Sequence, residues 1–261
     1  MSRLLTPLLP ALLLFAACVA GASSAHAQAA GAPGAPQATD PIYLPEPEPQ
    51  PAPVEVTSGR LPETYEDGTK RTEREVLKLS DDSIVNNGAY VEYFPNGTKF
   101  AEGRFDHGVH DGAWSFWHDN GQLCKTVNFI KGMADGAWDV FRADGTLEAK
   151  KSYKNNKRDG QWFLYHEDGK TPKVEENYVD GLRDGVSRFY YADGKLQREL
   201  HFKNNQMDGP FTEWDAAGRK VAEVNFREGK RHGKLTMHRP DGTTIDQTYD
   251  NGRLLREPAA E

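Results

Sequence analysis

The sequence predicts an all-β fold, an elongated single-layer antiparallel meander of about seven stacked β-hairpins that follows a disordered Pro-rich segment. Three observations predict this fold. Glycines recur every 24 residues through the C-terminal two-thirds of the 261-residue chain, and aromatic residues keep the same period. Asn-Gly or Asp-Gly pairs recur with them, and no stretch shows the three-to-four spacing of an amphipathic helix.

Residues 1–27 have the pattern of a secretory signal peptide. Arg3 precedes an apolar stretch from Leu4 to Ala20, and Ala25-His26-Ala27 has the small-x-small form that precedes a cleavage site. Prolines interrupt the apolar stretch, which is short for a bilayer, so we expect no transmembrane span in the mature chain. The expected location is outside the cytoplasm, in the periplasm or cell envelope of a bacterium.

A second interpretation of the same segment is lipidation at Cys18. Phe15-Ala16-Ala17-Cys18 resembles the lipobox of bacterial lipoproteins, although that box favours Leu where this chain has Phe. Soluble export and a lipid anchor therefore both stay open. The other cysteine, Cys124, is expected to be buried as a small apolar residue. Two cysteines exclude a disulfide-stapled scaffold and a Cys-based zinc or iron–sulfur site.

Residues 28–60 are expected to be a disordered linker rich in Pro and Ala. Alternating prolines in Pro45-Glu46-Pro47-Glu48-Pro49 favour extended polyproline II, and the segment cannot bury enough apolar surface to fold. We expect a spacer, with a Pro-rich docking ligand as the alternative. Residues 61–86 carry Asp67-Gly68 and Val76-Leu77-Lys78-Leu79 at the wrong spacing for a full unit, which predicts a degenerate N-terminal cap.

Residues 87–254 are expected to form the repeat domain, and three glycine columns set its register. The third column, from Gly108 to Gly252, holds only Gly or Asn, the residue types that tolerate positive φ. One extra residue falls between Gly169 and Gly185. Residues 255–261 are expected to be a charged tail that protects the last sheet edge. The structural glycines of the first column are Gly88, Gly112, Gly136, Gly160, Gly185, Gly209 and Gly233.

Each unit is expected to contain two strands. In one unit the first strand runs from about Gly112 to Trp117 and stops at Asp119-Asn120-Gly121, and the second runs from Leu123 to Phe129. Asn-Gly and Asp-Gly predict tight hairpin turns, because these residues adopt left-handed backbone at little cost. A looser turn, here Lys131 to Gly136, is expected to lead into the next unit.

Aromatic residues occupy fixed positions in the units. The residues two and five places after each first-column glycine fall on opposite faces of a regular strand, so both faces should be partly apolar. Curvature should bring most rings into contact with one another. Any portion left open would be an aromatic groove suited to a protein strand or a glycan chain. The expected partner contacts are Trp117, Phe141, Tyr165, Tyr190 and Trp214.

These motifs resemble the MORN repeat. Phe226-Arg227-Glu228-Gly229-Lys230-Arg231-His232-Gly233, followed by Asp241-Gly242, is similar to its unit, and the 24-residue form looks like a bacterial branch whose members include antitoxin-like proteins. The resemblance covers residues 87–254 and implies an elongated twisted sheet used as a scaffold or docking surface. The Tyr-x-Gly-x-Trp strand of the family survives only around Gly103, so lipid binding assigned to some eukaryotic members does not carry over.

The sequence predicts no enzymatic activity, no cofactor and no metal site. No residue lies in a nucleophile motif, and no glycine loop matches a phosphate cradle. Equivalent aspartates from Asp111 to Asp208 would lie about 10 Å apart in successive hairpins, too far to share a calcium ion. His118 and His166 lie two units apart. His107 and His110 with their neighbouring aspartates are expected to be exposed turn residues rather than a zinc or nickel site.

Charge and composition restrict the function further. A net charge of −7, with Lys and Arg scattered singly, excludes a nucleic-acid footprint. We expect an exported non-enzymatic scaffold that presents an extended β-sheet surface to an unidentified protein partner in the bacterial cell envelope. The alternatives are an envelope carbohydrate or peptidoglycan binder that uses stacked aromatics, an antitoxin- or immunity-like protein, and a hydrolase whose site the sequence does not show.

Overall fold

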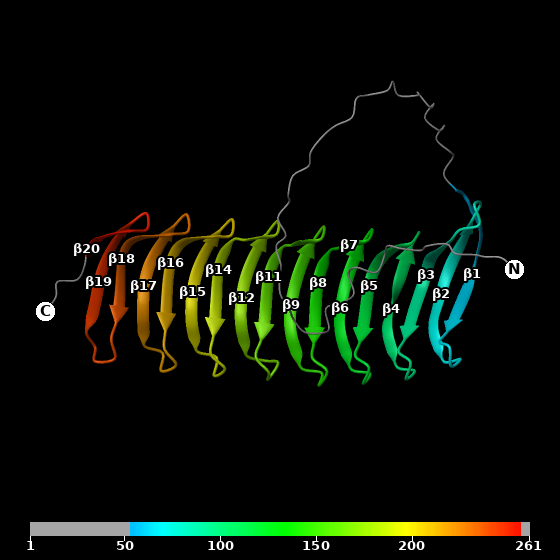
Figure 1. Ribbon diagram of the computed structural model, residues 1–261, viewed down its shortest axis with the longest axis horizontal. Helices are drawn as coiled ribbons and strands as arrows, with labels where there is room; N and C mark the ends of the chain where they lie inside the picture. The colour runs from blue at the N-terminus through cyan, green and yellow to red at the C-terminus, as the bar shows by residue number, and fades with distance from the viewer. Residues whose placement is uncertain (1–52, 257–261) are drawn as a thin grey trace, which may run out of the picture. The chain divides into compact units, whose positions relative to one another are not determined.

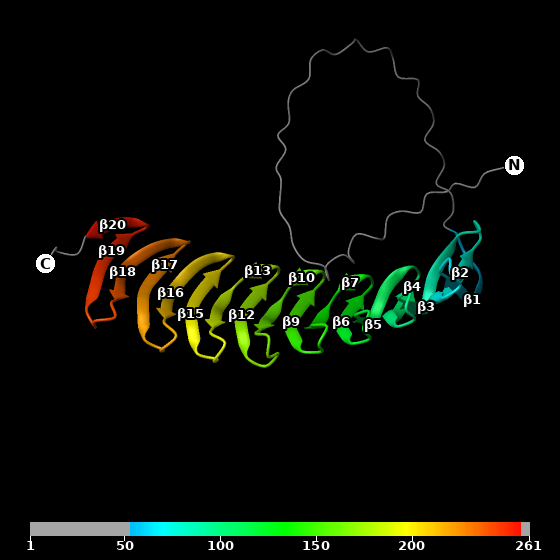
Figure 2. The same cartoon turned by 60° about the horizontal axis from the view of Figure 1, so that its bottom comes forward.

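The computed structural model describes residues 53–256, which form one open antiparallel β-sheet without a helix (Figure 1). Strands that follow one another in the chain pair with one another, and two views show them side by side and curved (Figure 2). The predicted all-β meander is confirmed. Nothing in the described part of the chain is a helix able to cross a bilayer. The strands are β1 (Glu55–Thr64), β2 (Lys70–Leu79), β3 (Ile84–Tyr93), β4 (Lys99–Asp106), β5 (Val109–Trp117), β6 (Leu123–Ile130), β7 (Met133–Ala134), β8 (Gly136–Phe141), β9 (Leu147–Lys154), β10 (Lys157–Arg158), β11 (Gly160–Tyr165), β12 (Pro172–Val179), β13 (Leu182–Arg183), β14 (Gly185–Tyr190), β15 (Leu196–Lys203), β16 (Gln206–Trp214), β17 (Lys220–Arg227), β18 (Lys230–His238), β19 (Thr244–Asp250) and β20 (Arg253–Arg256).

The ends of the sheet differ from the expected boundaries. β1 begins at Glu55, so the linker expected over residues 28–60 is wrong for its last six residues, which pair with β2. β1 tolerates Pro62 because it is an edge strand, where a missing N–H donor costs least. The expected cap at 61–86 belongs to a hairpin of the same sheet. At the other end β20 reaches two residues into the expected tail.

The signal peptide expected at residues 1–27, its Cys18 and the linker before Pro53 lie outside the described residues. The same holds for the last part of the tail, residues 257–261. Their expected roles stay predictions.

The Asn-Gly and Asp-Gly turns differ from the tight hairpin turns, with left-handed backbone at both residues, that the sequence predicts. In the β5–β6 turn, His118 N–H donates to Gln122 O at 2.8 Å and Gly121 N–H donates to His118 O at 2.9 Å. Only Gly121 has left-handed backbone, with φ of 83°. Asn120 Oδ1 instead accepts the Gln122 N–H at 2.9 Å. Asn120 therefore shapes the turn through its side-chain oxygen, as in an Asx turn. The loop between His118 and Gln122 has three residues.

The turns expected to be looser are the tight ones. Ile130 pairs with Met133, which leaves only Lys131 and Gly132 between the strands. Both have positive φ, 50° and 77°, as a type I′ turn requires. The Gly132 N–H then donates to the His110 carbonyl of the preceding unit at 2.8 Å. Such a bond recurs in the other units, so these turns connect hairpins as well as closing them.

The first-column glycines all have positive φ and lie in the register opposite an aromatic residue. Gly112 pairs with Phe129, and Gly209, whose φ is 118°, pairs with Phe226. A Cβ on Gly209 would lie 2.9 Å from the Cβ of His201, so a larger residue would meet both strain and a clash there.

One face of the sheet, here called the core face, carries most of the buried side chains. Trp114 and Phe116 are 2% and 3% exposed and pack with Val127 and Cys124, which confirms the burial expected for Cys124. Ring contacts then pass from unit to unit along this face. The rings in this series are Tyr90, Trp114, His110, Phe129, Trp138, Tyr153, Trp162 and Tyr178.

Candidate interaction surface

The opposite face, here called the open face, carries the five aromatic residues expected to contact a partner. All five are half-buried and stand in the same register position of successive units. Each is paired across the hairpin with one residue, and together these pairs form what we call the aromatic row. Its pairs are Trp117 with Leu123, Phe141 with Leu147, Tyr165 with Pro172, Tyr190 with Leu196 and Trp214 with Lys220.

The backbone of the aromatic row is held by side chains of the preceding unit. His118 Nε2 donates to the Phe141 carbonyl at 3.0 Å, and His166 Nε2 donates to the Tyr190 carbonyl at 3.0 Å. Arg142 makes the corresponding bond to the Tyr165 carbonyl at 2.9 Å. The two histidines weighed as metal ligands therefore connect neighbouring hairpins.

Acidic side chains run beside the aromatic row on the open face. Residues that are paired from one strand to the next form a line across the sheet, and we call the carboxylates in this line the acidic row. The residues that stand between the carboxylates are Ser115, Thr126, Lys150, Phe163, Arg188, Thr212 and Thr236. The carboxylates from β4 to β19 belong to Glu102, Asp139, Glu175, Glu199, Glu223 and Asp246.

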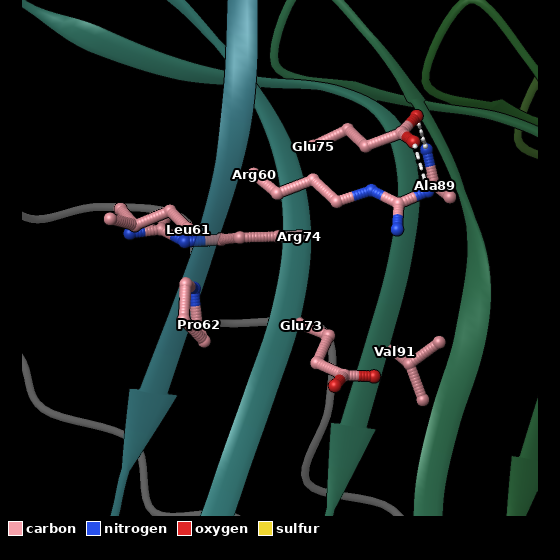
Figure 3. Close-up of a pocket in the computed structure, with 8 residues that line it drawn as sticks. All are labelled: Arg60, Leu61, Pro62, Glu73, Arg74, Glu75, Ala89 and Val91. Carbon is pink, nitrogen blue, oxygen red and sulfur yellow. Dashed lines mark hydrogen bonds and ion pairs between the residues drawn. The ribbon is translucent and has the colours of Figure 1, made fainter.

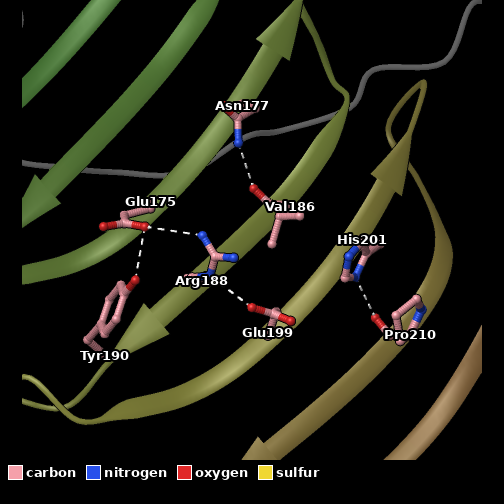
Figure 4. A network of polar contacts seen from close by, with 8 residues as sticks. All are labelled: Glu175, Asn177, Val186, Arg188, Tyr190, Glu199, His201 and Pro210. Atoms are coloured by element: carbon pink, nitrogen blue, oxygen red, sulfur yellow. Dashed lines mark hydrogen bonds and ion pairs between the residues drawn. The ribbon is translucent and has the colours of Figure 1, made fainter.

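The two rows contact each other through polar groups in the middle of the sheet (Figure 4). The Tyr190 hydroxyl donates to Glu175 at 2.9 Å. Arg188 lies between two carboxylates, with Nε 2.8 Å from Glu199 and Nη1 3.9 Å from Glu175. Burial, and then the bond to the Glu175 carboxylate, raise the pKa of Tyr190 to about 12. Tyr190 is therefore a neutral donor at physiological pH, held by its neighbours.

Lysines pair with carboxylates toward both ends of the acidic row. Lys99 Nζ lies 2.7 Å from Glu102 and 5.5 Å from the centroid of the Trp117 ring, and Lys220 Nζ lies 2.6 Å from Glu223. These ion pairs raise the pKa of Lys99 and lower that of Glu223. The aromatic row is thus bordered by paired charges rather than by a field of one sign.

Two shallow hollows lie in the described sheet. One, of about 320 Å³, lies at the N-terminal hairpins, where Arg60 and Ala89 N–H both donate to Glu75 (Figure 3). The other, of about 490 Å³, includes Arg142 and Tyr165 and so adjoins the aromatic row.

The structure separates the histidines considered as a metal cluster. His107 lies 2.7 Å from both Asp106 and Glu55, and these two bonds raise its pKa. His110 instead packs among Phe105, Trp114 and a third ring, and burial lowers its pKa. Within residues 53–256 no group of three or more His, Cys, Asp or Glu side chains could hold a metal ion.

Sequence reasoning missed half of the aromatic row. Leu123, Leu147, Pro172 and Leu196 alternate with the predicted rings, and each is half-buried. The signal was present, because three of these residues stand two places after a turn glycine, at the start of the second strand. Recognising the alternation requires knowing which residues pair across each hairpin. That pairing depends on the length of the turn.

Comparison with known proteins identifies the repeat. The family described as MORN repeat variant matches residues 111–131, which cover the β5–β6 hairpin, and residues 183–204, which cover β14 and β15. No curated protein matches the chain. A solved structure titled "Crystal Structure of TcdB2-TccC3-TEV" is similar over 74% of this chain and 12% of that chain, with 11% identity and a TM-score of 0.22, a likeness too weak to support an argument. Two segments inside this sheet of repeated hairpins therefore match the MORN repeat variant, which supports a MORN-type repeat.

Proposed function

We propose that the protein is an exported, non-enzymatic scaffold whose open face presents the aromatic row to a protein partner in the bacterial cell envelope. One observation carries the proposal: half-buried aromatic and aliphatic side chains alternate from Trp117 to Leu196 across successive hairpins. No second layer covers them within the described residues. Contiguous apolar surface of this kind marks interaction sites.

The aromatic row is already ordered before any partner binds. The carbonyls of Phe141, Tyr165, Tyr190 and Trp214 are each held by a side chain of the preceding unit. Tyr165 also stacks on Phe163, with ring centroids 6.4 Å apart. A rigid surface loses little conformational entropy on association, and large rings are the side chains that dominate binding energy.

Export is the part of the proposal that rests on sequence alone. Its support is the signal pattern over residues 1–27, with soluble release and attachment through Cys18 as the two routes. The intact mass of the mature chain distinguishes them, because a start at Gln28 excludes a lipid on Cys18.

The test is capture of a partner from an envelope extract with the full mature chain as bait. Replacing both Trp117 and Tyr165 by Ala should abolish capture of a stoichiometric protein without changing the circular dichroism spectrum. Leu164→Ala is the matched control. Leu164 precedes Tyr165 in the chain and is 40% exposed, but its side chain belongs to the core face, whereas Tyr165 belongs to the open face. Equal capture by all three proteins would contradict the proposal, and hydrolysis of an ester, peptide or glycoside panel would contradict its non-enzymatic part.

A glycan partner is the second candidate, and the spacing of the rings favours it. Equivalent rings of adjacent units are two strands apart, about 9.6 Å, which is close to the length of one disaccharide in an extended glycan chain. Peptidoglycan sedimentation that is lost in the Trp117→Ala and Tyr165→Ala double variant, with no protein captured, would select this candidate.

A further inference from the structure

A cluster of three cations lies on the core face, opposite to the aromatic row. Lys125 of β6 pairs with Phe116, Lys151 of β9 pairs with Trp138, and Arg158 of β10 follows on the next strand. Each of the three is paired with a residue whose ring lies on the core face, so the three cations lie on that face too. We call them the cationic cluster.

Aromatic rings lie against these charges. Lys151 Nζ lies 5.5 Å from the centroid of Trp162, and the Arg158 guanidinium lies 4.7 Å from the same ring. Arg158 also donates to the Tyr178 hydroxyl at 3.0 Å, and Lys125 Nζ lies 4.6 Å from the centroid of Phe116. Cation–π contacts hold the charges of Lys151 and Arg158 in place without neutralising them.

Two cations of the cluster, Lys151 and Arg158, are not neutralised by a carboxylate of residues 53–256. Lys151 and Arg158 form no ion pair with any residue in the described part of the chain. Burial lowers the pKa of Lys151, and the charges of Arg158 and Lys125 act in the same direction, whereas Glu148 opposes them. The remaining local carboxylate, Glu176, accepts the Tyr178 hydroxyl at 2.6 Å and lies 3.6 Å from Arg183.

A buried hydrogen-bond donor without a partner among the described residues also lies beside the cluster. The indole N–H groups of Trp114 and Trp162 donate to backbone carbonyls at 3.0 and 2.8 Å. The corresponding Nε1–H of Trp138 is buried and has no partner in the described structure. The Asn128 carbonyl of the adjacent strand accepts the Asp135 N–H instead. The unpartnered indole N–H of Trp138 therefore adds a free donor beside Lys151 and Arg158, whereas the Glu176 carboxylate already accepts the Tyr178 hydroxyl and lies near Arg183.

We propose that the cationic cluster docks a short acidic segment of a protein partner, a binding surface separate from the aromatic row. The charges are complementary, and the flat rings between the cations offer contact area to an extended chain. A short segment meets only this local patch. A membrane or a nucleic acid is an extended polyanion, and the chain's net charge of −7 opposes its approach.

The probe is a short fluorescent peptide of alternating Glu and Ala, titrated with the full chain and followed by fluorescence anisotropy. Replacing both Lys151 and Arg158 by Gln should weaken binding about tenfold, because a complementary charge pair is lost at each position. Lys151→Arg should retain binding. Lys150→Gln is the matched control: it removes the same charge from the adjacent residue, which pairs with Asp139 on the open face.

Three outcomes would overturn the proposal. The first is equal loss of binding in the Lys150→Gln variant and the cluster variant. The second is equal affinity for a peptide in which Gln replaces Glu. The third is binding to anionic vesicles or to single-stranded DNA without binding to the acidic peptide. Because the aromatic row is intact in every variant, partner capture through the open face should be unchanged, which separates the two proposals.

Discussion

Single polar side chains at the strand ends connect neighbouring hairpins. Asn96 accepts the Thr98 N–H at 3.0 Å and so shapes its own turn, while its Nδ2 donates to the Asp119 carbonyl of the next unit at 2.8 Å. Asn120 repeats both bonds one unit later, the second to the Ala143 carbonyl at 2.7 Å. One residue type therefore serves local turn geometry and the contact between units.

Gly103 is required by packing and not by its backbone angle. An added Cβ would lie 2.2 Å from the Trp114 indole, which is 2% exposed and cannot move into solvent. We predict that Gly103→Ala destabilises the sheet by roughly 1–3 kcal/mol, the usual cost of overpacking. Chemical denaturation measures the difference.

Gly59→Ala provides the control for this prediction. Gly59 lies in β1, and a Cβ there would meet nothing within 4 Å, so its free energy of unfolding should change by about 0.5 kcal/mol or less. Equal effects of the two substitutions would show that the contact between Gly103 and Trp114 is not what excludes a side chain.

At the scale of strands and turns, much could be predicted from the sequence. The glycine and aromatic periods place Gly112 opposite Phe129 and separate Trp114 from Trp117 onto two faces, because side-chain alternation is local. The turn types were inverted. Asn120 acts through its side chain, whereas Lys131 adopts positive φ when glycine follows it, and residue identity alone does not distinguish these two solutions.

Interactions between distant segments could not be predicted in this way. Glu55 in β1 lies 2.7 Å from His107 in the β4–β5 turn, 52 residues later, and no periodic feature connects the two. The start of β1 likewise depends on its pairing with β2, and its Pro-rich surroundings gave no sign of a strand. The alternation of Leu with the rings depends on which residues pair across each hairpin.

The contact between His107 and Glu55 predicts pH-dependent order in β1. Because the carboxylates of Glu55 and Asp106 raise the pKa of His107 above its usual 6.5, the contact stabilises the folded state fully below pH 6.5. This stabilisation is lost as the pH rises through the raised value. Amide hydrogen exchange in β1, corrected for intrinsic rates, should therefore become faster relative to β5 above that value.

His107→Asn should remove this pH dependence, because Asn tolerates the φ of 47° but does not titrate. The effect should be small, since the three side chains are more than half exposed. An unchanged pH profile in the variant would assign the dependence to another group.

On the scale of the whole sheet, contacts between strands are confined to neighbours. Removing residues 209–232 deletes one full period, so Gly233 takes the position of Gly209 and every later side chain keeps its face. We predict a folded protein that is less stable by about 1–4 kcal/mol, as expected for the loss of 24 residues. Circular dichroism and thermal unfolding measure the outcome.

Removal of half a period is the corresponding negative control. Deleting residues 209–220 would join strands that run in opposite directions and should prevent the C-terminal hairpins from joining the sheet. If both deletions behaved alike, the sheet would not be built from independent adjacent units.

The longer unit shows where the chain accommodates a change in length. Tyr165 pairs with Pro172 across one more residue than separates Trp117 from Leu123, and Asp168 accepts the N–H groups of both Lys170 and Thr171 in the widened tip. Beyond it Gly185 still faces Phe202. The tips along this side of the ribbon are therefore natural positions for grafted loops, epitope tags or spectroscopic labels, since additions there leave the order of the strands intact.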